Sequence, residues 1–338
     1  MATTADIAIV GATTAVGEAM LEFLGERELP VDRLYLLDQE QSAGTKLEFR
    51  DRYITVEPVE AFDFSQVRLV LFTNGPFVEQ VARAAAEGAV VIDGSGGFID
   101  DPDVPAVVAE VNPERLADYG ERGIVACPGS LAVMLAVALK PIVDAAGIER
   151  INVATYQSVS RLGKEGVEEL AGQTARLLNA QDTKPKVFPR QIAFNVLPQV
   201  GQLLENGYSE EEMRLVRELR KVLGDEQLMV NATAVHVPVF YGYAAAVHIE
   251  TETRLTAVDA VGALEKASGL KVLDDKARYR YPTPVTEANQ QDEVFLGRIR
   301  EDISHPRGLN FWVVADNVRK GAALNSVLLA ELLVRDYL

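Results

Sequence analysis

A turn bordered by glycines, set between an apolar run and an amphipathic run, constrains this chain most. Residues 7–10 (Ile-Ala-Ile-Val) are predicted to form a buried strand, residues 11–17 a tight turn, and residues 16–24 a helix. A strand, a glycine-bearing turn and a helix in this order begin the βαβ unit that holds a pyrophosphate at the helix N-terminus. The chain is therefore predicted to open with a Rossmann-type sheet.

The same alternation of strand and helix continues over the first 150 residues. Predicted strands cover residues 34–37, 69–72, 90–92 and 124–126, and predicted helices cover residues 78–87 and 131–146. Strands that alternate with helices pair in parallel, and the helices cover both faces of the sheet. The expected class is α/β, with a Rossmann-type parallel sheet as the first domain.

A second pattern begins near residue 149 and predicts an α+β domain with a large, mostly antiparallel sheet. Predicted strands cover residues 151–159, 228–241, 244–250 and 309–315. A helix covers residues 163–178, a surface loop 179–189, and a second helix runs from the capping residue Ser209 to residue 223. A last helix, residues 318–337, is expected to pack back on the first domain. The predicted domains are 1–130 (dinucleotide-binding), 131–317 (catalytic and dimerisation-like) and 318–338 (returning helix).

Composition excludes several classes of partner. The 338 residues carry a net charge of −17, and a surface this acidic repels nucleic acid and anionic membranes. The single cysteine, Cys127, allows no intramolecular disulfide, which fits a reducing compartment. The first six residues lack the basic and apolar segments of a signal peptide. We expect a cytoplasmic protein with no membrane span and no metal site.

The turn and the end of the second strand hold the candidate nucleotide contacts. Thr14 occupies the position of the middle glycine of such turns, so the motif is incomplete, and a tight turn without a ligand is the alternative. Asp38 lies 21 residues past Gly17, close to the spacing of about 20 expected for the acid that binds the adenosine ribose. A carboxylate there would repel a 2′-phosphate, so NAD(H) is expected rather than NADP(H), or else no nucleotide. The candidate contacts in the turn are Gly11, Thr13, Thr14, Ala15, Val16 and Gly17.

An ordered set of short motifs resembles the aspartate-semialdehyde dehydrogenase family over nearly the whole chain. The motifs are Gly11-Ala12-Thr13, Ser42-Ala43-Gly44, Asp101-Pro102-Asp103-Val104-Pro105, Thr155-Tyr156-Gln157, Phe194-Asn195-Val196, Val237-Pro238-Val239-Phe240, Tyr281-Pro282-Thr283-Pro284, Gly297-Arg298-Ile299-Arg300 and the run from Asn317 to Asn325. The resemblance implies a homodimer. It also implies a reaction in which a cysteine thiolate attacks a carbonyl, NADPH exchanges hydride, a histidine moves protons and an arginine holds the substrate carboxylate.

The side chains that carry this chemistry in the family are absent at the matching positions. Ser130 stands where the resemblance places the nucleophilic cysteine, and a serine hydroxyl is a poor nucleophile without an adjacent base. The alternative is that Ser130 caps the helix that begins at Leu131. Tyr243 replaces the histidine, and a phenol is a poor base at neutral pH. His236 replaces the carboxylate-binding arginine and cannot form its two-pronged contact.

At the other matching positions, some residues differ from those that the resemblance implies and others are the same. Ile99 replaces a phosphate-binding arginine, Gln41 the arginine expected near a 2′-phosphate, and Arg214 a lysine whose charge it keeps. Gln157, Glu211 and Asn325 match retained family residues: a site glutamine, an acid that contacts substrate, and part of the segment beside the nicotinamide. Each also has a structural alternative: a strand glutamine, an acid on a helix surface, and a helix start that docks the domains.

Three hypotheses follow. The first is a dimeric paralogue without the family reaction that still binds a nucleotide; the simultaneous loss of nucleophile, base and clamp favours it. The second is an active NAD(P)-dependent oxidoreductase of amino-acid biosynthesis, on an aldehyde or acyl group related to aspartate semialdehyde. Cys127 would then be a displaced nucleophile; the alternative is that Cys127, at the end of the apolar strand over residues 124–126, is a buried core residue. Arg161, where the family carries glycine, would bind a different acid. The third, an N-acetyl-glutamyl-phosphate reductase, fits residues 237–242 less well.

Overall fold

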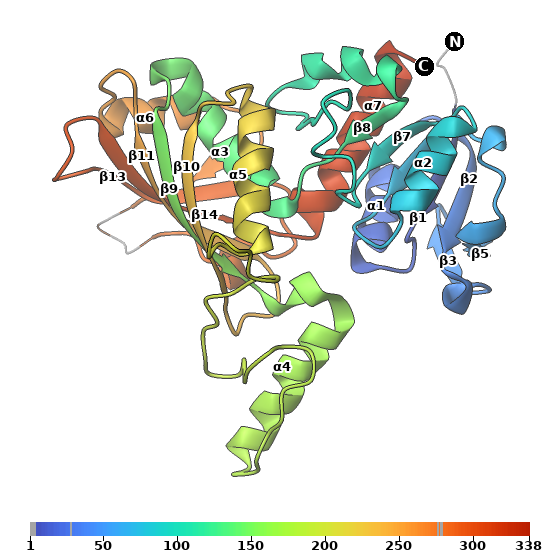
Figure 1. The fold of residues 1–338 in the computed structure, drawn as a ribbon, viewed down its shortest axis with the longest axis horizontal. Helices are drawn as coiled ribbons and strands as arrows, with labels where there is room; N and C mark the ends of the chain where they lie inside the picture. The colour runs from blue at the N-terminus through green and yellow to red at the C-terminus, as the bar shows by residue number, and fades with distance from the viewer. Residues whose placement is uncertain (1–4, 28, 276, 278–279) are drawn as a thin grey trace. The chain divides into compact units, whose positions relative to one another are not determined.

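A computed structural model describes residues 5–27, 29–275, 277 and 280–338 (Figure 1). Residues 1–4, part of the segment on which the expectation about a leader peptide rests, lie outside the described residues. The chain divides into two compact units. The first unit comprises Met1–Val133 together with Val318–Leu338, and the second unit comprises Met134–Asn317. In the part of the chain that is described, no helix has the length and apolar character needed to cross a membrane.

The first unit is built on a six-stranded parallel sheet, as predicted. The strand order is β5-β2-β1-β6-β7-β8, so chain order reverses on either side of the central strand β1. The central strands β6 and β7 are fully buried because helices cover a parallel sheet on both faces. The strands are β1 (Ala5–Val10), β2 (Val31–Asp38), β5 (Glu57–Pro58), β6 (Leu69–Phe72), β7 (Val90–Asp93) and β8 (Ile124–Ala126).

The C-terminal segment completes the core of the first unit. Residues predicted as one helix form a π-helical stretch, η8 (Arg319–Leu324), followed by α7 (Asn325–Asp336). α7 packs against β6 and β7 and beside α1 (Ala15–Glu26). Its apolar side chains are buried in the same cluster as those of β1. The core of this unit therefore joins β1 to a helix about 300 residues further along the chain.

A hairpin that the sequence analysis did not predict follows β2. It consists of β3 (Lys46–Phe49) and β4 (Arg52–Thr55), which pair antiparallel. The two turn residues, Arg50 and Asp51, have φ angles of 48° and 63°. A two-residue hairpin turn of type I′ requires positive φ at both positions and is usually signalled by Asn-Gly or Asp-Gly. This turn adopts the conformation without glycine, so the usual sequence signal is missing.

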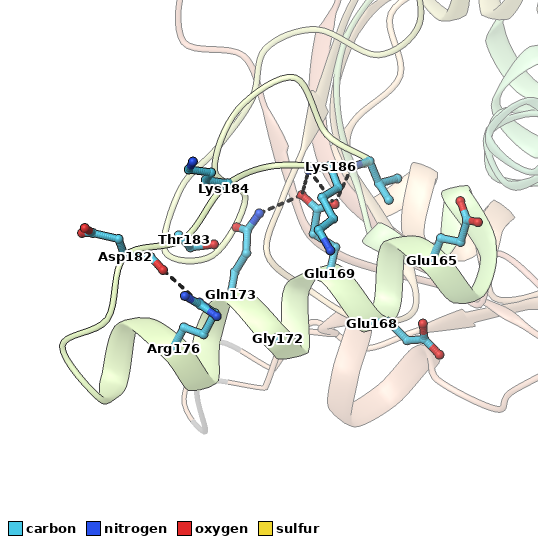
Figure 2. A pocket seen from close by; sticks show the side chains of 11 residues that line it. Glu165, Glu168, Glu169, Gly172, Gln173, Arg176, Asp182, Thr183, Lys184 and Lys186 are labelled. Atoms are coloured by element: carbon cyan, nitrogen blue, oxygen red, sulfur yellow. Dashed lines mark hydrogen bonds between the residues drawn. The ribbon is translucent and has the colours of Figure 1, made fainter.

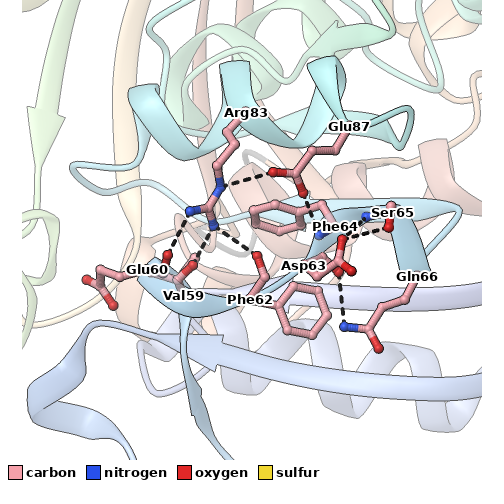
Figure 3. A network of polar contacts seen from close by, with 9 residues as sticks. All are labelled: Val59, Glu60, Phe62, Asp63, Phe64, Ser65, Gln66, Arg83 and Glu87. Atoms are coloured by element: carbon pink, nitrogen blue, oxygen red, sulfur yellow. Dashed lines mark hydrogen bonds and ion pairs between the residues drawn. The ribbon is translucent and has the colours of Figure 1, made fainter.

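Arg83 on α2 (Val78–Ala86) clamps the segment that follows β5 (Figure 3). Its guanidinium donates to the backbone carbonyls of Glu60 at 2.7 Å, Val59 at 2.6 Å and Phe62 at 3.2 Å. It also lies over the Phe64 ring, 4.9 Å from the centroid. This segment starts beside Asp38, because Pro58 of β5 pairs with Asp38 of β2. The clamp therefore fixes the chain next to the candidate ribose-binding acid.

The second unit contains a six-stranded mixed sheet in the order β10-β9-β11-β14-β13-β12. The strands are β9 (Arg150–Gln157), β10 (Met229–His236), β11 (Tyr243–Glu250), β12 (Leu270–Val272), β13 (Val294–Glu301) and β14 (Gly308–Ala315). α3 (Ser130–Ala146) leads into this unit, α6 (Ala257–Leu264) packs on β12 and β13, and Pro284–Ala288 form a π-helical turn. The elements α6, β12 and β13 were not predicted from the sequence.

Two expectations about β10 were wrong. The predicted strand over residues 228–241 ends at His236, because the chain turns before Pro238, which has no N–H for a sheet. β10 also pairs parallel, not antiparallel, with β9. The connection between them runs through α4 (Gly163–Leu178) and α5 (Glu210–Leu223), the kind of long crossover that parallel neighbours require. The α4 bounds and the capping box of Ser209 and Glu212 agree with the prediction.

Alternation along β9 and β11 separates a buried face of this sheet from a half-exposed one. Ile151, Val153 and Val247 are buried, whereas Asn152 and His248 on the opposite face are partly exposed. The cross-strand register places Asn152 directly beside His248. One face of the sheet therefore remains open in a single chain.

The loop after α4 is held to that helix by two polar side chains (Figure 2). Glu169 accepts hydrogen bonds from the backbone N–H groups of Lys186 and Val187, and Gln173 Oε1 accepts from Ile192 and Ala193. A hollow of about 750 Å³, lined mainly by charged and polar residues, lies between α4 and residues 182–187. The predicted surface loop is thus ordered by contacts to α4.

We expect the Arg83→Gln variant to lower the free energy of unfolding by about 2 kcal/mol, since it removes hydrogen bonds from a charged donor to three carbonyls. Chemical denaturation would measure the loss. Arg52→Gln, a matched change at an exposed residue of β4, should stay within about 0.5 kcal/mol of the unchanged protein. Equal stability of the two variants would contradict the stabilising role of Arg83.

Candidate functional site

The turn after β1 needs glycine at both ends. Gly11 has a φ of +81°, and a Cβ there would lie 2.0 Å from Thr73 Oγ1 at the end of β6. A Cβ on Gly17 would lie 2.3 Å from the carbonyl oxygen of Gly11. The first glycine allows the tight turn, and the last allows α1 to approach the strand end closely.

Thr14 fits the turn without the conformational freedom of glycine. Its φ of −81° and ψ of 158° are ordinary for an N-cap residue. Its hydroxyl accepts from Gly17 N at 3.1 Å and donates to Gly11 O at 2.7 Å, so Thr14 caps α1. Ala15 and Val16 then form the first helical turn. The absence of the middle glycine therefore leaves the helix N-terminus correctly formed.

Asp38 ends β2 and is tied to the same turn. One of its carboxylate oxygens accepts from Thr13 N at 3.0 Å and from Thr13 Oγ1 at 2.6 Å. The other oxygen accepts from Gln39 N at 2.8 Å. The side chain is only 5% exposed, and three of its roughly four acceptor positions are used. Asp38 thus organises the turn and keeps capacity for one further donor.

These residues meet where a Rossmann sheet binds its ligand. β1 is the strand at which the sheet order reverses, and ligands of such sheets lie at the carboxyl ends of the strands flanking that point. Thr73 Oγ1 is buried there with no hydrogen-bond partner in the described residues. An unsatisfied buried hydroxyl beside a glycine turn and a helix N-terminus fits a bound dinucleotide. Gly11 and residues 14–17 would hold its phosphates, and Asp38 would face its ribose.

Ser130 is the first residue of α3 and is half-buried. The carbonyl of Gly129 accepts the first hydrogen bond of the helix, from Val133 N at 3.0 Å. Gly129 therefore holds the N-cap position, and the interpretation of Ser130 as the cap is wrong by one residue. A Cβ on Gly321 would lie 2.5 Å from the Ser130 Cβ, so η8 can approach Ser130 only with glycine at this position.

Asn325 and Cys127 are both part of the packed interior. Asn325 is 1% exposed, accepts from Ala109 N at 2.9 Å and donates to Val107 O at 3.0 Å. Its amide also donates to Cys127 Sγ at 3.2 Å. Cys127 is 3% exposed and belongs to the main apolar core of the first unit. A thiol in this environment is shielded from a substrate.

The other matching residues gather at one end of the sheet in the second unit. Gln157 and His236 are register partners at the carboxyl ends of β9 and β10, so their side chains share a face. Tyr243 is the first residue of β11. Ala245 pairs with Thr155, and residues two apart on a strand share a face, so Tyr243 lies on the same face as Gln157. His236 also packs edge-on against Phe188, with ring centroids 5.2 Å apart.

Two arginines and two glutamates complete this group. Glu212 of α5 accepts from Ala234 N of β10 at 2.8 Å, and this contact fixes the start of α5 beside the strand end. Arg161 pairs with Glu211 at 2.8 Å, and Arg214 pairs with Glu218 at 2.7 Å. The sheet-end cluster is Gln157, Arg161, Glu211, Arg214, Glu218, His236 and Tyr243.

The turn that carries Arg161 is held by Asn317. This turn, η5 (Val159–Leu162), follows β9 directly. Asn317 Oδ1 accepts from Gly242 N at 2.9 Å, and its amide donates to Ser160 Oγ at 3.1 Å. Asn317 therefore links the turn before β11 to the turn after β9. This role could not be predicted from the sequence, because the contacts join residues 75 to 157 positions apart.

Burial makes both replacement side chains poor proton acceptors. Burial, with a further contribution from the Arg161 charge, lowers the pKa of His236 to about 4, although the backbone of Gln157 and the Glu211 charge oppose this. Burial raises the pKa of Tyr243 well above its usual value, and the Arg161 charge only partly offsets this. At neutral pH His236 is uncharged and Tyr243 keeps its proton.

The structure thus brings the predicted residues together in two groups. The nucleotide candidates Gly11 to Gly17 and Asp38 meet in the first unit, which also holds Ser130 and Asn325. Gln157, Glu211, His236 and Tyr243 meet in the second unit. Thr73 was missed, although its position directly after a buried strand beside the glycine turn was a usable signal. Among the described residues, no group of three or more His, Cys, Asp or Glu side chains could hold a metal ion.

Comparison with known proteins agrees with this architecture. Residues 6–119 match the semialdehyde dehydrogenase NAD binding domain, and residues 139–320 match the semialdehyde dehydrogenase dimerisation domain. The two matches define the class of two-domain semialdehyde dehydrogenases.

Full-length relatives make the assignment more specific. The chain is 52% identical to aspartate-semialdehyde dehydrogenase 2 of Vibrio cholerae and 49% identical to aspartate-semialdehyde dehydrogenase of Shewanella violacea, each over 98% of both chains. A crystal structure of the Vibrio cholerae enzyme II complexed with ASA superimposes with a TM-score of 0.96 at 50% identity, over 99% of each chain. The chain belongs to the aspartate-semialdehyde dehydrogenase family.

The low pKa of His236 predicts a loss of stability in acid. Between pH 6.5 and about 4 the unfolded chain binds more protons at this residue than the folded chain, so the free energy of unfolding falls as pH falls. The full effect is on the order of 3 kcal/mol. Urea unfolding at a series of pH values should show that the free energy of unfolding depends less steeply on pH in His236→Gln than in the unchanged protein. The same pH dependence in both proteins would contradict the low pKa of His236.

Proposed function

We propose that this protein binds a nicotinamide nucleotide but does not carry out the thiol-dependent reaction of its family. The proposal is carried by one observation: no accessible thiol lies at the start of α3. Ser130 stands at the position of the nucleophile, and the only thiol of the chain, Cys127, is 3% exposed and engaged by Asn325. A hydroxyl without an activating base reacts far more slowly than a thiolate.

The sheet-end cluster supports the same proposal. Tyr243 holds its proton at neutral pH, and His236 is a weak base because its pKa is about 4. Neither offers a proton acceptor with a pKa near the working pH, which efficient general base catalysis requires. His236 also lacks the planar fork with which an arginine holds a carboxylate. Nucleophile, base and clamp act as a unit and do not fail additively, so replacement of the nucleophile already removes most of the rate.

Nucleotide binding and self-association are the functions that the fold retains. The glycine turn, the capped α1 and the unsatisfied Thr73 hydroxyl favour a bound dinucleotide. Asp38, together with Gln41 in place of an arginine, favours NAD(H) over NADP(H), because an acid repels a 2′-phosphate. The open face of the second-unit sheet and the match to a dimerisation domain favour a homodimer.

An active oxidoreductase with altered chemistry is the second candidate. Arg161 is the observation that favours it, since it adds a cation close to where the family's arginine is missing. Cys127 could not serve as its nucleophile in this fold because the thiol is buried. Such an enzyme would have to transfer hydride without a covalent thioester.

We expect no turnover of L-aspartate semialdehyde with phosphate and either NAD or NADP. The rate of nucleotide reduction, followed by absorbance, should equal that of the Ser130→Ala variant and of a buffer blank. Turnover that disappears in the Ser130→Ala variant would overturn the proposed loss of function.

We expect the purified protein to bind NADH more tightly than NADPH in calorimetric titrations. Replacing both Asp38→Ser and Gln41→Arg should reverse the preference, with a change of at least about tenfold in the ratio of the two Kd values, because the cation gains a charge-assisted contact to the 2′-phosphate. Glu40→Gln removes an exposed neighbouring acid and serves as the matched control. A preference for NADPH in the unchanged protein would contradict the role of Asp38.

A further inference from the structure

The hollow between α4 and residues 182–187, called here the α4 hollow, has walls that polar contacts hold in place (Figure 2). Glu169 accepts from two backbone N–H groups of the loop, and Gln173, which is 3% exposed, donates to Glu169 at 2.7 Å. Further along the helix, Arg176 Nε donates to the carbonyl oxygen of Asp182 at 2.8 Å. The hollow of about 750 Å³ is therefore formed before any ligand binds, and it has the size of a site for a small organic molecule.

Gly172 leaves the floor of the α4 hollow open. It lies on α4 between Glu169 and Arg176, and a Cβ at this position would meet no atom within 4 Å. Glycine weakens the interior of a helix, and neither a positive φ nor a close neighbour requires it here. The effect of this glycine is to keep free the space that a side chain would fill.

Three cations line the α4 hollow without a carboxylate partner. They are Arg176, Lys184 and Lys186, and in the part of the chain that the structure describes none of them forms an ion pair. Lys186 extends from the loop toward α4, and Arg176 extends from α4 toward the loop (Figure 2). Lys184 lies on the loop between the contacts that the helix makes with Asp182 and Lys186. The terminal nitrogens of all three side chains can therefore donate to a ligand.

The acids that line the hollow do not neutralise these cations. Glu169 is occupied by the backbone of the loop. Glu168 points away from the loop and pairs at 3.7 Å with the lysine one turn earlier in α4, and Asp182 also points outward (Figure 2). Glu165 lies 11 residues before Arg176, which is about 16 Å along a helix. The end of the hollow near Arg176 is therefore positively charged, although the whole chain is acidic.

We propose that the α4 hollow binds a small molecule that carries a di- or triphosphate group, held by Arg176, Lys184 and Lys186. Arginine and lysine are side chains that proteins commonly use to hold phosphate oxygens. Three cations around one space match a group with several negative charges better than a single carboxylate. The rest of the ligand lies over Gly172, where the hollow is open. This site belongs to the second unit, whereas the candidate dinucleotide contacts in the turn after β1 belong to the first.

The test uses inorganic pyrophosphate, with inorganic phosphate and citrate as comparison anions. Calorimetric titration of the full-length protein at neutral pH, free of divalent cations, should give pyrophosphate a Kd below about 1 mM. This Kd should be at least about fivefold lower than that of either comparison anion, because pyrophosphate presents more charged acceptor oxygens to the three cations. Equal or tighter binding of citrate or phosphate, or no binding of pyrophosphate, would each overturn the proposal.

Two substitutions place the bound anion in the hollow. Gly172→Leu fills the open space over α4 and should raise the Kd for pyrophosphate at least about fivefold. Gly262→Leu is its matched control, because Gly262 is also a helical glycine whose added Cβ meets no atom within 4 Å, and it should leave the Kd unchanged. Lys184→Gln should raise the Kd at least about threefold, whereas Lys266→Gln, at an exposed lysine outside the hollow, should not.

Both hollow variants should keep the circular dichroism spectrum of the unchanged protein, because leucine is a better helix former than glycine and Lys184 is exposed. An unchanged Kd in Gly172→Leu would show that pyrophosphate binds elsewhere, for example at the turn after β1, and would overturn the site. An unchanged Kd in Lys184→Gln would overturn the role of that lysine. These titrations involve neither turnover nor a nicotinamide nucleotide, so their outcome is independent of the proposed function.

Discussion

Parallel strand pairing is the constraint on which both candidate sites depend. Parallel neighbours end at the same edge of a sheet, so residues that directly follow them are gathered there. In the first unit this places the turn after β1, Asp38 after β2 and Thr73 after β6 around one strand end. In the second unit the parallel pair β9 and β10 places Gln157 beside His236. Each site is thus a consequence of strand direction before any side-chain chemistry is considered.

The two candidate sites differ in how their residues are held. At the strand end of the first unit, the glycines that allow close approach are present, and Thr14 replaces a glycine by providing a helix cap. At the sheet end of the second unit, Glu211 and Glu218 are each paired with an arginine, Arg161 and Arg214 respectively. Burying an unpaired charge is costly, and each of these pairs offsets the charge of a partly or fully buried acid.

Long-range contacts explain where the sequence-based predictions failed. The β3–β4 hairpin was missed because Arg50 and Asp51 adopt positive φ angles without a glycine signal. β10 was assigned the wrong direction, because its pairing with β9 is set by a crossover of about 70 residues and not by its own residue pattern. Ser130 was assigned to the cap because serine favours that position locally, whereas the hydrogen bond from Val133 shows that Gly129 occupies it.

The sequence by itself determined the class of fold, the glycine turn, and most helices and strands. Those properties follow from local periodicity and from motifs in chain order. The tertiary structure alone decided that Cys127 is buried against Asn325, that Asp38 is tied to Thr13, and that Arg161 pairs with Glu211. These contacts join residues 198, 25 and 50 positions apart. Side-chain environment, which sets reactivity and charge, arises from packing between distant segments, and no local pattern encodes it.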